Sequence, residues 1–385
     1  HFPEERANLE AYVDAVHRLA DEVDLFYLRP SNDFFPVHSE EFNLAADAFI
    51  AKYIQNPKLR NVVAYMNPLY GGMADATPAY VHAIVSVLYM QGASRFVGGS
   101  DRFAQLLVSV IESAGGEVRC NEGAEWVEVN NRHVDYVRST KGHEYRADHY
   151  ISAIHPCTLL PLLSEKAFPK AYRTRLNDIP NAYSAFSVYV KFKPETFPYI
   201  NHSEYYMTRY DKVWHFGEHH DTWPLGFLFM TPPEDNQGKY ADKALITAPM
   251  IFEEVEKWAQ TTVGRRGKDY ELWKKEQAQR LLERIEEIHP GFNACVDKVN
   301  TASPLTIRDY YGAKEGTMCG FSKDYKNTVL SQLPVVTKVD NLLLTGQYNN
   351  LPGFCGVPLT AINTVEAILG RNYVIGRLNS IHEQL

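Results

Sequence analysis

The residues best placed to do chemistry lie near the C-terminus, where a strand, a glycine-containing loop and a helix follow one another. Asn341–Thr345 contains three consecutive leucines, which is typical of a strand buried on both faces. A helix is predicted to begin at Val357-Pro358, since proline suits a first turn. The residues that could hold a bound group there are Gly346, Gln347, Gly353, Gly356, Val357 and Pro358. Free amides and the helix dipole would stabilise an anion or a polarised ring, although an ordinary strand, loop and helix would show the same pattern.

A second glycine-containing segment precedes a helix and a group of strands. It begins with Phe96-Val-Gly98-Gly99, and a second pair, Gly115-Gly116, follows the helix. The elements predicted along it are a helix that ends at Ala114 and strands at Glu117–Cys120, Glu125–Val129, His133–Ser139 and Tyr150–Ile154. The Asn130-Asn131 pair is expected to form the turn between two of these strands, because asparagine tolerates positive φ.

Other parts of the chain have patterns that predict the elements around these two segments. Tyr80–Met90 is the longest apolar stretch; it is too short to span a bilayer and is predicted to be a core helix. Alternating side chains predict a strand at Tyr183–Phe192, with neighbouring strands at Gly226–Met230 and Leu245–Met250. Tyr270–Ile288 has the apolar spacing of an amphipathic helix.

Taken in order, these elements resemble the flavin-dependent carotenoid desaturase, carotenoid isomerase and retinol saturase family, within the flavin amine-oxidase-like superfamily. Leu344-Thr345-Gly346-Gln347 and the loop that ends in Gly356-Val357-Pro358 are similar to the family's flavin-contacting end. The Thr-Gly-Gln sequence is most similar to bacterial retinol-saturase-like proteins. Ser303-Pro304, followed by Gly316 and Gly320, is similar to the family's segment beside the flavin.

This resemblance implies a cofactor, a substrate class and a set of contacts. The cofactor would be FAD, and the implied contacts are Gly346, Gln347, Gly353, Gly356, Val357, Pro358, Ser303 and Pro304. The implied activity is that of an oxidoreductase on conjugated double bonds of a lipophilic polyene, such as retinol or a carotenoid, by saturation, desaturation or isomerisation. The resemblance assigns no catalytic residue. Two alternatives stay open: an amine-oxidase-type flavoprotein, and a cofactor-free module that binds an apolar ligand.

One motif expected from the resemblance does not occur in the sequence. The family opens with a strand and G-x-G-x-x-G, whose glycines let the backbone approach the pyrophosphate of FAD, and no G-x-G-x-x-G occurs among these 385 residues. The chain begins at His1, and we therefore expect an N-terminally truncated chain whose FAD-binding unit is incomplete. We also expect an empty cofactor site, inactivity of the chain alone, and self-association through the exposed edge of the sheet.

The predicted fold class is α/β, or mixed α+β, with two interleaved domains. Residues 91–158 and 336–372 are predicted to form an incomplete Rossmann-like FAD-binding domain. Residues 1–90 and 159–335 are predicted to form a substrate domain of mixed sheet and helices, and residues 373–385 a C-terminal tail.

Composition excludes several classes of partner. The net charge of −8 and the isoelectric point near 6.0 argue against nucleic acid. Five cysteines without a C-x-x-C spacing predict neither zinc nor a disulfide framework, and the histidine-rich loop at 215–221 is interpreted as solvated rather than as a metal site. The expected location is the cytoplasm. The expected partners are a lipophilic small molecule, at most a peripheral contact with a membrane, and a second copy of the chain.

Three smaller features have structural interpretations. Arg265-Arg266 is predicted to lie in an exposed turn. Arg308-Asp309-Tyr310 could face the flavin or form a structural ion pair. Cys355 is interpreted as a small buried residue rather than a redox group.

Overall fold

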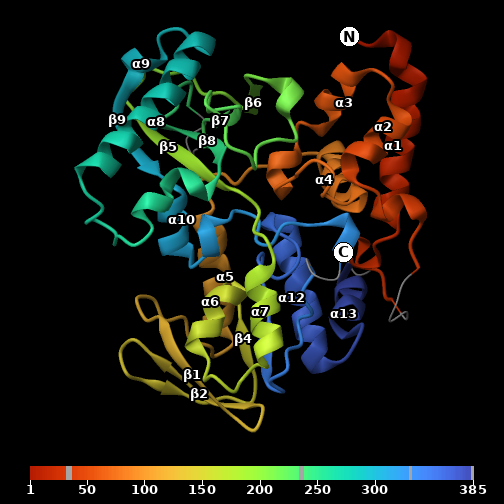
Figure 1. Ribbon diagram of the computed structural model, residues 1–385, viewed down its shortest axis with the longest axis vertical. Coiled ribbons are helices and arrows are strands. Elements are labelled where there is room, and N and C mark those ends of the chain that lie inside the picture. Colours follow the sequence, from red (N-terminus) through yellow and green to blue (C-terminus); the bar gives the residue numbers. More distant parts are fainter. Residues whose placement is uncertain (32–36, 234–237, 329–331, 383–385) are drawn as a thin grey trace.

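The computed structural model describes residues 1–31, 37–233, 238–328 and 332–382. Figure 1 shows a group of helices beside a five-stranded sheet in the upper half of the molecule, and shorter sheets with further helices in the lower half. The mixture of helices and sheets confirms the predicted fold class.

The N-terminal helices pack around one apolar cluster. They are α1 (Arg6–Asp21), α2 (Ala46–Tyr53), α3 (Pro57–Ala64) and α4 (Ala79–Gln91). The predicted core helix is α4, where His82 is buried between the hydroxyl groups of Tyr12 and Tyr70, at 2.6 and 2.9 Å. Burial lowers the pKa of His82 to about 4, so the imidazole is neutral at pH 7. The Tyr12 hydroxyl group links α4 to α1, and the Tyr70 hydroxyl group links α4 to the short helix Asn67–Tyr70.

The large sheet contains β6 (Ser203–Met207), β7 (Gly226–Met230), β8 (Lys243–Met250), β5 (Ser184–Phe192) and β9 (Val296–Ala302), in that spatial order. The three predicted strands are confirmed as β5, β7 and β8, but of the two expected neighbours of β5 only β8 pairs with it, since β7 pairs with β8. β6 and β9 were not predicted. Each neighbouring pair of these described strands is antiparallel, so the sheet expected to be mixed is antiparallel. The predicted amphipathic helix is α8 (Lys268–Ile288), and its Leu281 and Ile285 pack in the same cluster as Phe186 of β5.

The lower half contains a two-stranded parallel sheet built from distant parts of the sequence. β10 (Leu342–Leu344) pairs with β4 (Tyr150–Ser152), and Leu343 lies opposite Ile151. The prediction that these two strands share one sheet across the intervening segment is confirmed, while the division of the chain into two interleaved domains stays a prediction. Beside this sheet, β1 (Ala124–Asn130), β2 (His133–Ser139) and β3 (Glu144–Tyr145) form a meander.

The remaining described helices connect these sheets. They are α5 (Asp101–Ser113), α6 (Pro156–Leu159), α7 (Lys170–Asp178), α9 (Phe292–Cys295), α10 (Pro304–Tyr311), α12 (Gly353–Leu369) and α13 (Tyr373–His382). Among the described residues no single helix is long and apolar enough to cross a membrane; α12 and α13 reach that length and composition only together, with a bend of 118° between them.

The strand predicted at Glu117–Cys120 is wrong. These four residues are exposed and lie in no strand of the described structure. Their apolar and polar alternation was real, but a strand also needs a neighbour that satisfies its backbone groups. Here the side chains make local contacts instead, and the Arg119 guanidinium pairs with Glu117 and donates to Tyr145.

The predicted start of the C-terminal helix is also wrong. α12 begins at Gly353, so Val357 and Pro358 lie in its second turn rather than at its first amides. Pro352 is extended and Gly353 has a φ of 80°, which lets the chain enter the helix four residues earlier. Pro358 is exposed within the helix, where it removes one backbone donor. The other end is as predicted, since Gly370 caps the helix by donating to the Glu366 carbonyl.

Candidate cofactor and substrate site

Gly346 turns the chain away from the end of β10. Its φ is 88°, and a Cβ atom there would lie 3.3 Å from the Ala153 carbonyl oxygen, so glycine suits both the backbone conformation and the close approach. The Thr345 amide donates to the Ser152 carbonyl at 2.9 Å, which fixes the loop above the end of the parallel sheet. Loops at the carboxyl ends of parallel strands are common ligand positions.

Two glycines allow close packing between the Ser303-Pro304 segment and this loop. At Gly316 a Cβ atom would lie 2.2 Å from the Pro304 carbonyl oxygen, and at Gly320 it would lie 2.8 Å from the Tyr348 Cα atom. The backbone between them therefore packs directly on both predicted contact segments. Ser303 itself has a structural role, because it caps α10 and its Oγ lies 2.6 Å from the Tyr270 hydroxyl group.

His155 holds the base of the loop. It is buried, with ring centroids 4.8 Å from Phe321 and 5.3 Å from Tyr348. The Cys157 amide donates to Nδ1, so Nε2 carries the proton and donates to Asn181 at 3.0 Å. Burial lowers the pKa of His155 to about 4, which leaves the imidazole neutral at pH 7.

The start of α12 has the properties that a flavin ring requires. Gly353 has open space where a Cβ atom would lie, and its neighbour Phe354 is exposed. The Thr345 Oγ1 and Asn349 Oδ1 atoms are buried without a hydrogen-bond partner among the described residues. A ring with carbonyl and N–H groups would supply such partners, and the uncapped helix N-terminus favours negative charge. The residues present therefore fit a flavin at this end.

The structure changes the role predicted for Gly356. A Cβ atom there would lie 2.6–2.7 Å from three atoms of Leu351, so its missing side chain lets the loop close onto α12 rather than making room for a cofactor. Cys355 is half-buried and not fully buried as predicted, and burial raises the pKa of its thiol.

The charged segments outside this loop are structural. Arg266 is buried, contrary to the predicted exposed turn, and it pairs with Asp309. Arg308 also pairs with Asp309, at 2.8 Å, while Tyr310 is exposed. These contacts favour the structural ion pair over a role at the flavin. No group of three or more histidine, cysteine, aspartate or glutamate side chains in the described ranges could hold a metal ion.

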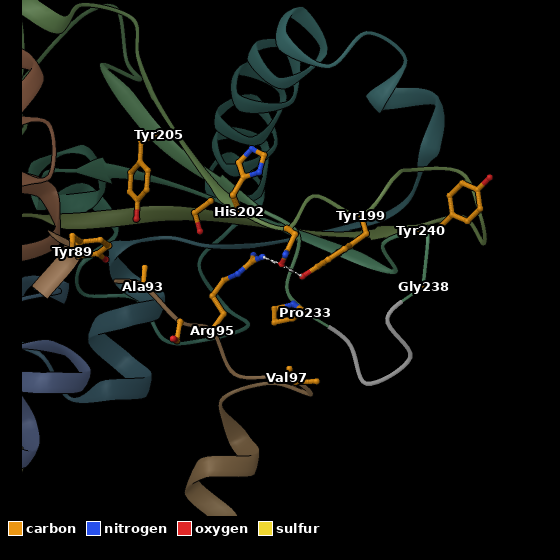
Figure 2. Close-up of a pocket in the computed structure, with 13 residues that line it drawn as sticks. Tyr89, Ala93, Arg95, Val97, Tyr199, His202, Tyr205, Pro233, Gly238 and Tyr240 are labelled. Atoms are coloured by element: carbon orange, nitrogen blue, oxygen red, sulfur yellow. Dashed lines mark hydrogen bonds between the residues drawn. The ribbon is translucent and has the colours of Figure 1, made fainter. Parts of the chain in front are cut away.

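A pocket of about 930 Å³ lies between the end of α4, the segment 93–97 and the edge of the large sheet. Figure 2 shows its aromatic walls, and the tyrosines that line it are Tyr89, Tyr199, Tyr205 and Tyr240. Burial raises the pKa of Tyr205, which keeps its hydroxyl group neutral. The only guanidinium among its described lining residues is that of Arg95, and none of those residues carries a carboxylate.

A cluster of phenylalanine rings connects the segment beside this pocket to the start of α12. Phe96, which follows Arg95, lies 4.9 Å from Phe354 and 5.5 Å from Phe103, measured between ring centroids. Phe103 of α5 lies 4.8 Å from Phe354. The segment 93–97, part of which lines the pocket, is therefore in contact with the predicted flavin end through these rings. Sequence reasoning used the glycines after Phe96 but missed Arg95, whose position directly before that motif was the available signal.

The fold agrees with comparisons to known proteins. A model of flavin containing amine oxidoreductases matches residues 27–368, and the chain belongs to this family of flavin-dependent oxidoreductases. The chain is 24% identical to all-trans-retinol 13,14-reductase of Rattus norvegicus over 96% of its own length, and 25% identical to the Homo sapiens protein over 82%. Cyclohexylamine oxidase from Brevibacterium oxydans IH-35A shares the fold, with a TM-score of 0.56 at 13% identity, over 99% of this chain and 76% of that structure.

The family confirms the predicted flavin cofactor and the oxidoreductase class. The chain spans 67% of the length of the rat relative and 55% of the human one. None of the predicted cofactor contacts is tested by these similarities, and they stay predictions.

Proposed function

We propose that this protein is an FAD-dependent oxidoreductase that acts on a conjugated double bond of a lipophilic polyene, most simply by saturation. The observation that carries the proposal is the aromatic pocket, whose lining residue Arg95 directly precedes Phe96, and the Phe96 ring contacts Phe354 at the glycine-containing start of α12. Its volume of about 930 Å³ is at the upper end of the range typical of small-molecule sites. The two named relatives that act on all-trans-retinol support this substrate class.

The chain's own residues would orient both molecules. When bound, the flavin supplies hydride chemistry. The first amides of α12 stabilise negative charge on a ring at Gly353, and Gly346 allows the backbone to approach it. His155 stays neutral and fixes the Tyr348 loop, and the exposed rings of Phe96 and Phe354 would offer an apolar surface to a bound ring.

The amine-oxidase alternative is less well supported by this pocket. An ammonium substrate would need a carboxylate or an aromatic cage without a competing cation. The described lining residues include Arg95 but no carboxylate, and two like charges in one half-enclosed site repel each other.

Product analysis tests the proposal directly. The protein is incubated anaerobically with FAD, a reductant and all-trans-retinol. The extracted products are then separated by chromatography, and their masses are measured by mass spectrometry. A gain of two hydrogens indicates saturation, and an unchanged mass with a new retention time indicates isomerisation. In a parallel incubation with oxidised FAD and no reductant, a loss of two hydrogens together with reduction of the flavin indicates desaturation. Oxidation of cyclohexylamine without conversion of any polyene would contradict the proposal. A titration with FAD, followed by flavin absorbance, separates either enzyme from a cofactor-free binding module.

Partners and location follow from the same substrate class. A lipophilic polyene partitions into membranes, so we propose a cytoplasmic protein that makes a peripheral contact with a membrane surface when it takes up its substrate.

A further inference from the structure

Arg95 is the residue in the pocket that the proposed function does not use. Its guanidinium donates to the Thr231 carbonyl at 3.0 Å and to the Tyr199 hydroxyl group and Asn201 Oδ1 at 3.2 Å each. All three acceptors are neutral, and no carboxylate among the described residues forms an ion pair with this side chain. A guanidinium has five N–H donors, so these contacts hold it in place and leave two donors for a ligand. Figure 2 shows Arg95 and Tyr199 on the wall of the pocket.

The surroundings make this positive charge costly without a ligand. Arg95 is partly buried, and the pocket beside it is lined by the rings of Tyr89, Tyr205 and Tyr240. A charge that is partly removed from water and has no counter-charge is unfavourable. The other basic group of the pocket, His202, differs because its Nε2 atom lies 3.3 Å from Glu204. Arg95 is thus held for an anion that the described chain does not supply.

We propose, resting on the proposed function, that the substrate is a polyene with an acidic end group, and that Arg95 binds its carboxylate. A carboxylate would accept a charge-assisted hydrogen bond from a remaining guanidinium donor, which is stronger than the bond an alcohol would accept, and a hydrocarbon accepts none. The Tyr199 hydroxyl group and Asn201 orient the guanidinium, and the apolar chain of the substrate lies against the tyrosine rings. Arg95 is a specificity-determining residue in this proposal and takes no part in electron transfer.

Matched pairs of ligands test the proposal on the unaltered protein. The first pair is cis-parinaric acid and its methyl ester, whose fluorescence rises on burial; the second is all-trans-retinoic acid and all-trans-retinol, followed by tryptophan quenching. At neutral pH we expect each acid to bind about tenfold more tightly than its uncharged partner, the factor typical of one charged hydrogen bond. Equal affinities within each pair would overturn the proposal. No flavin is needed for these measurements.

Variants then locate the preference. R95Q should abolish the preference for the acids by weakening the binding of the acids alone. R95K should retain part of the preference, because the charge stays but the planar guanidinium held by Tyr199 and Asn201 is lost. R138Q removes an exposed arginine that pairs with Glu125 far from the pocket, and it should keep the full preference. A preference that survives R95Q in a folded protein would overturn the assignment to Arg95. If R95Q fails to fold, the ligand pairs on the unaltered protein decide.

The two proposals fail in different ways. If retinol is converted but the acid and its ester bind equally, the acidic substrate is ruled out and the oxidoreductase activity stands. Selective binding of the acids without conversion of any polyene would leave Arg95 as an acid-binding residue and remove the proposed activity.

Discussion

His155 connects the stability of the loop to pH. In the folded protein its pKa is about 4, whereas in an unfolded chain it is near the usual 6.5. The unfolded state therefore binds more protons between these values, and stability falls as the pH drops from 6.5 towards 4. Between pH 7 and 5 we expect the free energy of unfolding, measured with urea, to fall by about 2 kcal/mol more in the unaltered protein than in H155N. The contribution of His82 to the pH dependence is the same in both proteins and cancels in the comparison. Identical pH dependence would contradict this prediction.

Gly320 is predicted to be required by close packing as well as by its backbone conformation. An alanine Cβ atom there would lie 2.8 Å from Tyr348 Cα, and its φ is 75°. Gly142 is the matched control, because its φ is 81° but nothing lies within 4 Å of an added Cβ. We expect G142A to cost about 1 kcal/mol from backbone strain, and G320A about 2 kcal/mol more from the clash. The unfolding free energies are compared by chemical denaturation. Equal losses in the two variants would show that the loop around Tyr348 moves to accept the added Cβ atom without a further cost.

The site residues differ in how far the sequence could predict them. The positive φ of Gly346 and Gly353 agrees with the predicted glycine-containing loop, because strand, loop and helix patterns are local, while their contact with a cofactor stays a prediction. Gly356 was found for the wrong reason, since only the fold places Leu351 against it. Arg95 was missed because its partners Tyr199 and Asn201 lie on a distant segment, and no local pattern relates them to it.

Among the elements, α10 is held at its far end by a buried ion pair. Arg266 and Asp309 have side chains that are 5% and 20% exposed, and this pair ties the helix that begins after Ser303 to the loop before α8. D309N would leave the Arg266 charge without its counter-charge, and we expect a loss of about 2 kcal/mol in unfolding free energy. D211N is the control, since its pair with Arg209 is exposed and should contribute nothing measurable. A similar result for both variants would show that the buried pair is not a stabilising contact.

The elements predicted correctly are those whose side-chain period was long and clear. β5 and α8 match their predicted ranges closely because one face of each is apolar over many residues. β9 was missed because Val296–Ala302 is polar and largely exposed, and it is a strand only because β5 pairs with it. The segment 117–120 shows the reverse case, where a strand-like pattern has no neighbour among the described strands.

At the scale of the whole molecule, α5 is an apolar helix without a matching partner. Within the described part of the chain it has no buried residue, and Leu106, Leu107, Val110 and Ile111 are 45–64% exposed. An isolated helix of 13 residues is marginal in water, so this one depends on burying its apolar face. Contiguous apolar surface of this kind is typical of an interface.

We therefore predict that the protein self-associates through α5. Light scattering after size exclusion should show a dimer or larger species at micromolar concentration, and the double substitution L106E and V110E should convert it to a monomer. L272E is the matched control: Leu272 is 59% exposed on α8 but lies among charged residues, and its replacement should leave the assembly unchanged. Because the α5 substitutions lie on exposed positions, the circular dichroism spectrum should keep the signal of the remaining fold and lose at most the contribution of α5. A protein that is monomeric over the whole concentration range would show that the exposed face of α5 is not an interface between copies of this chain.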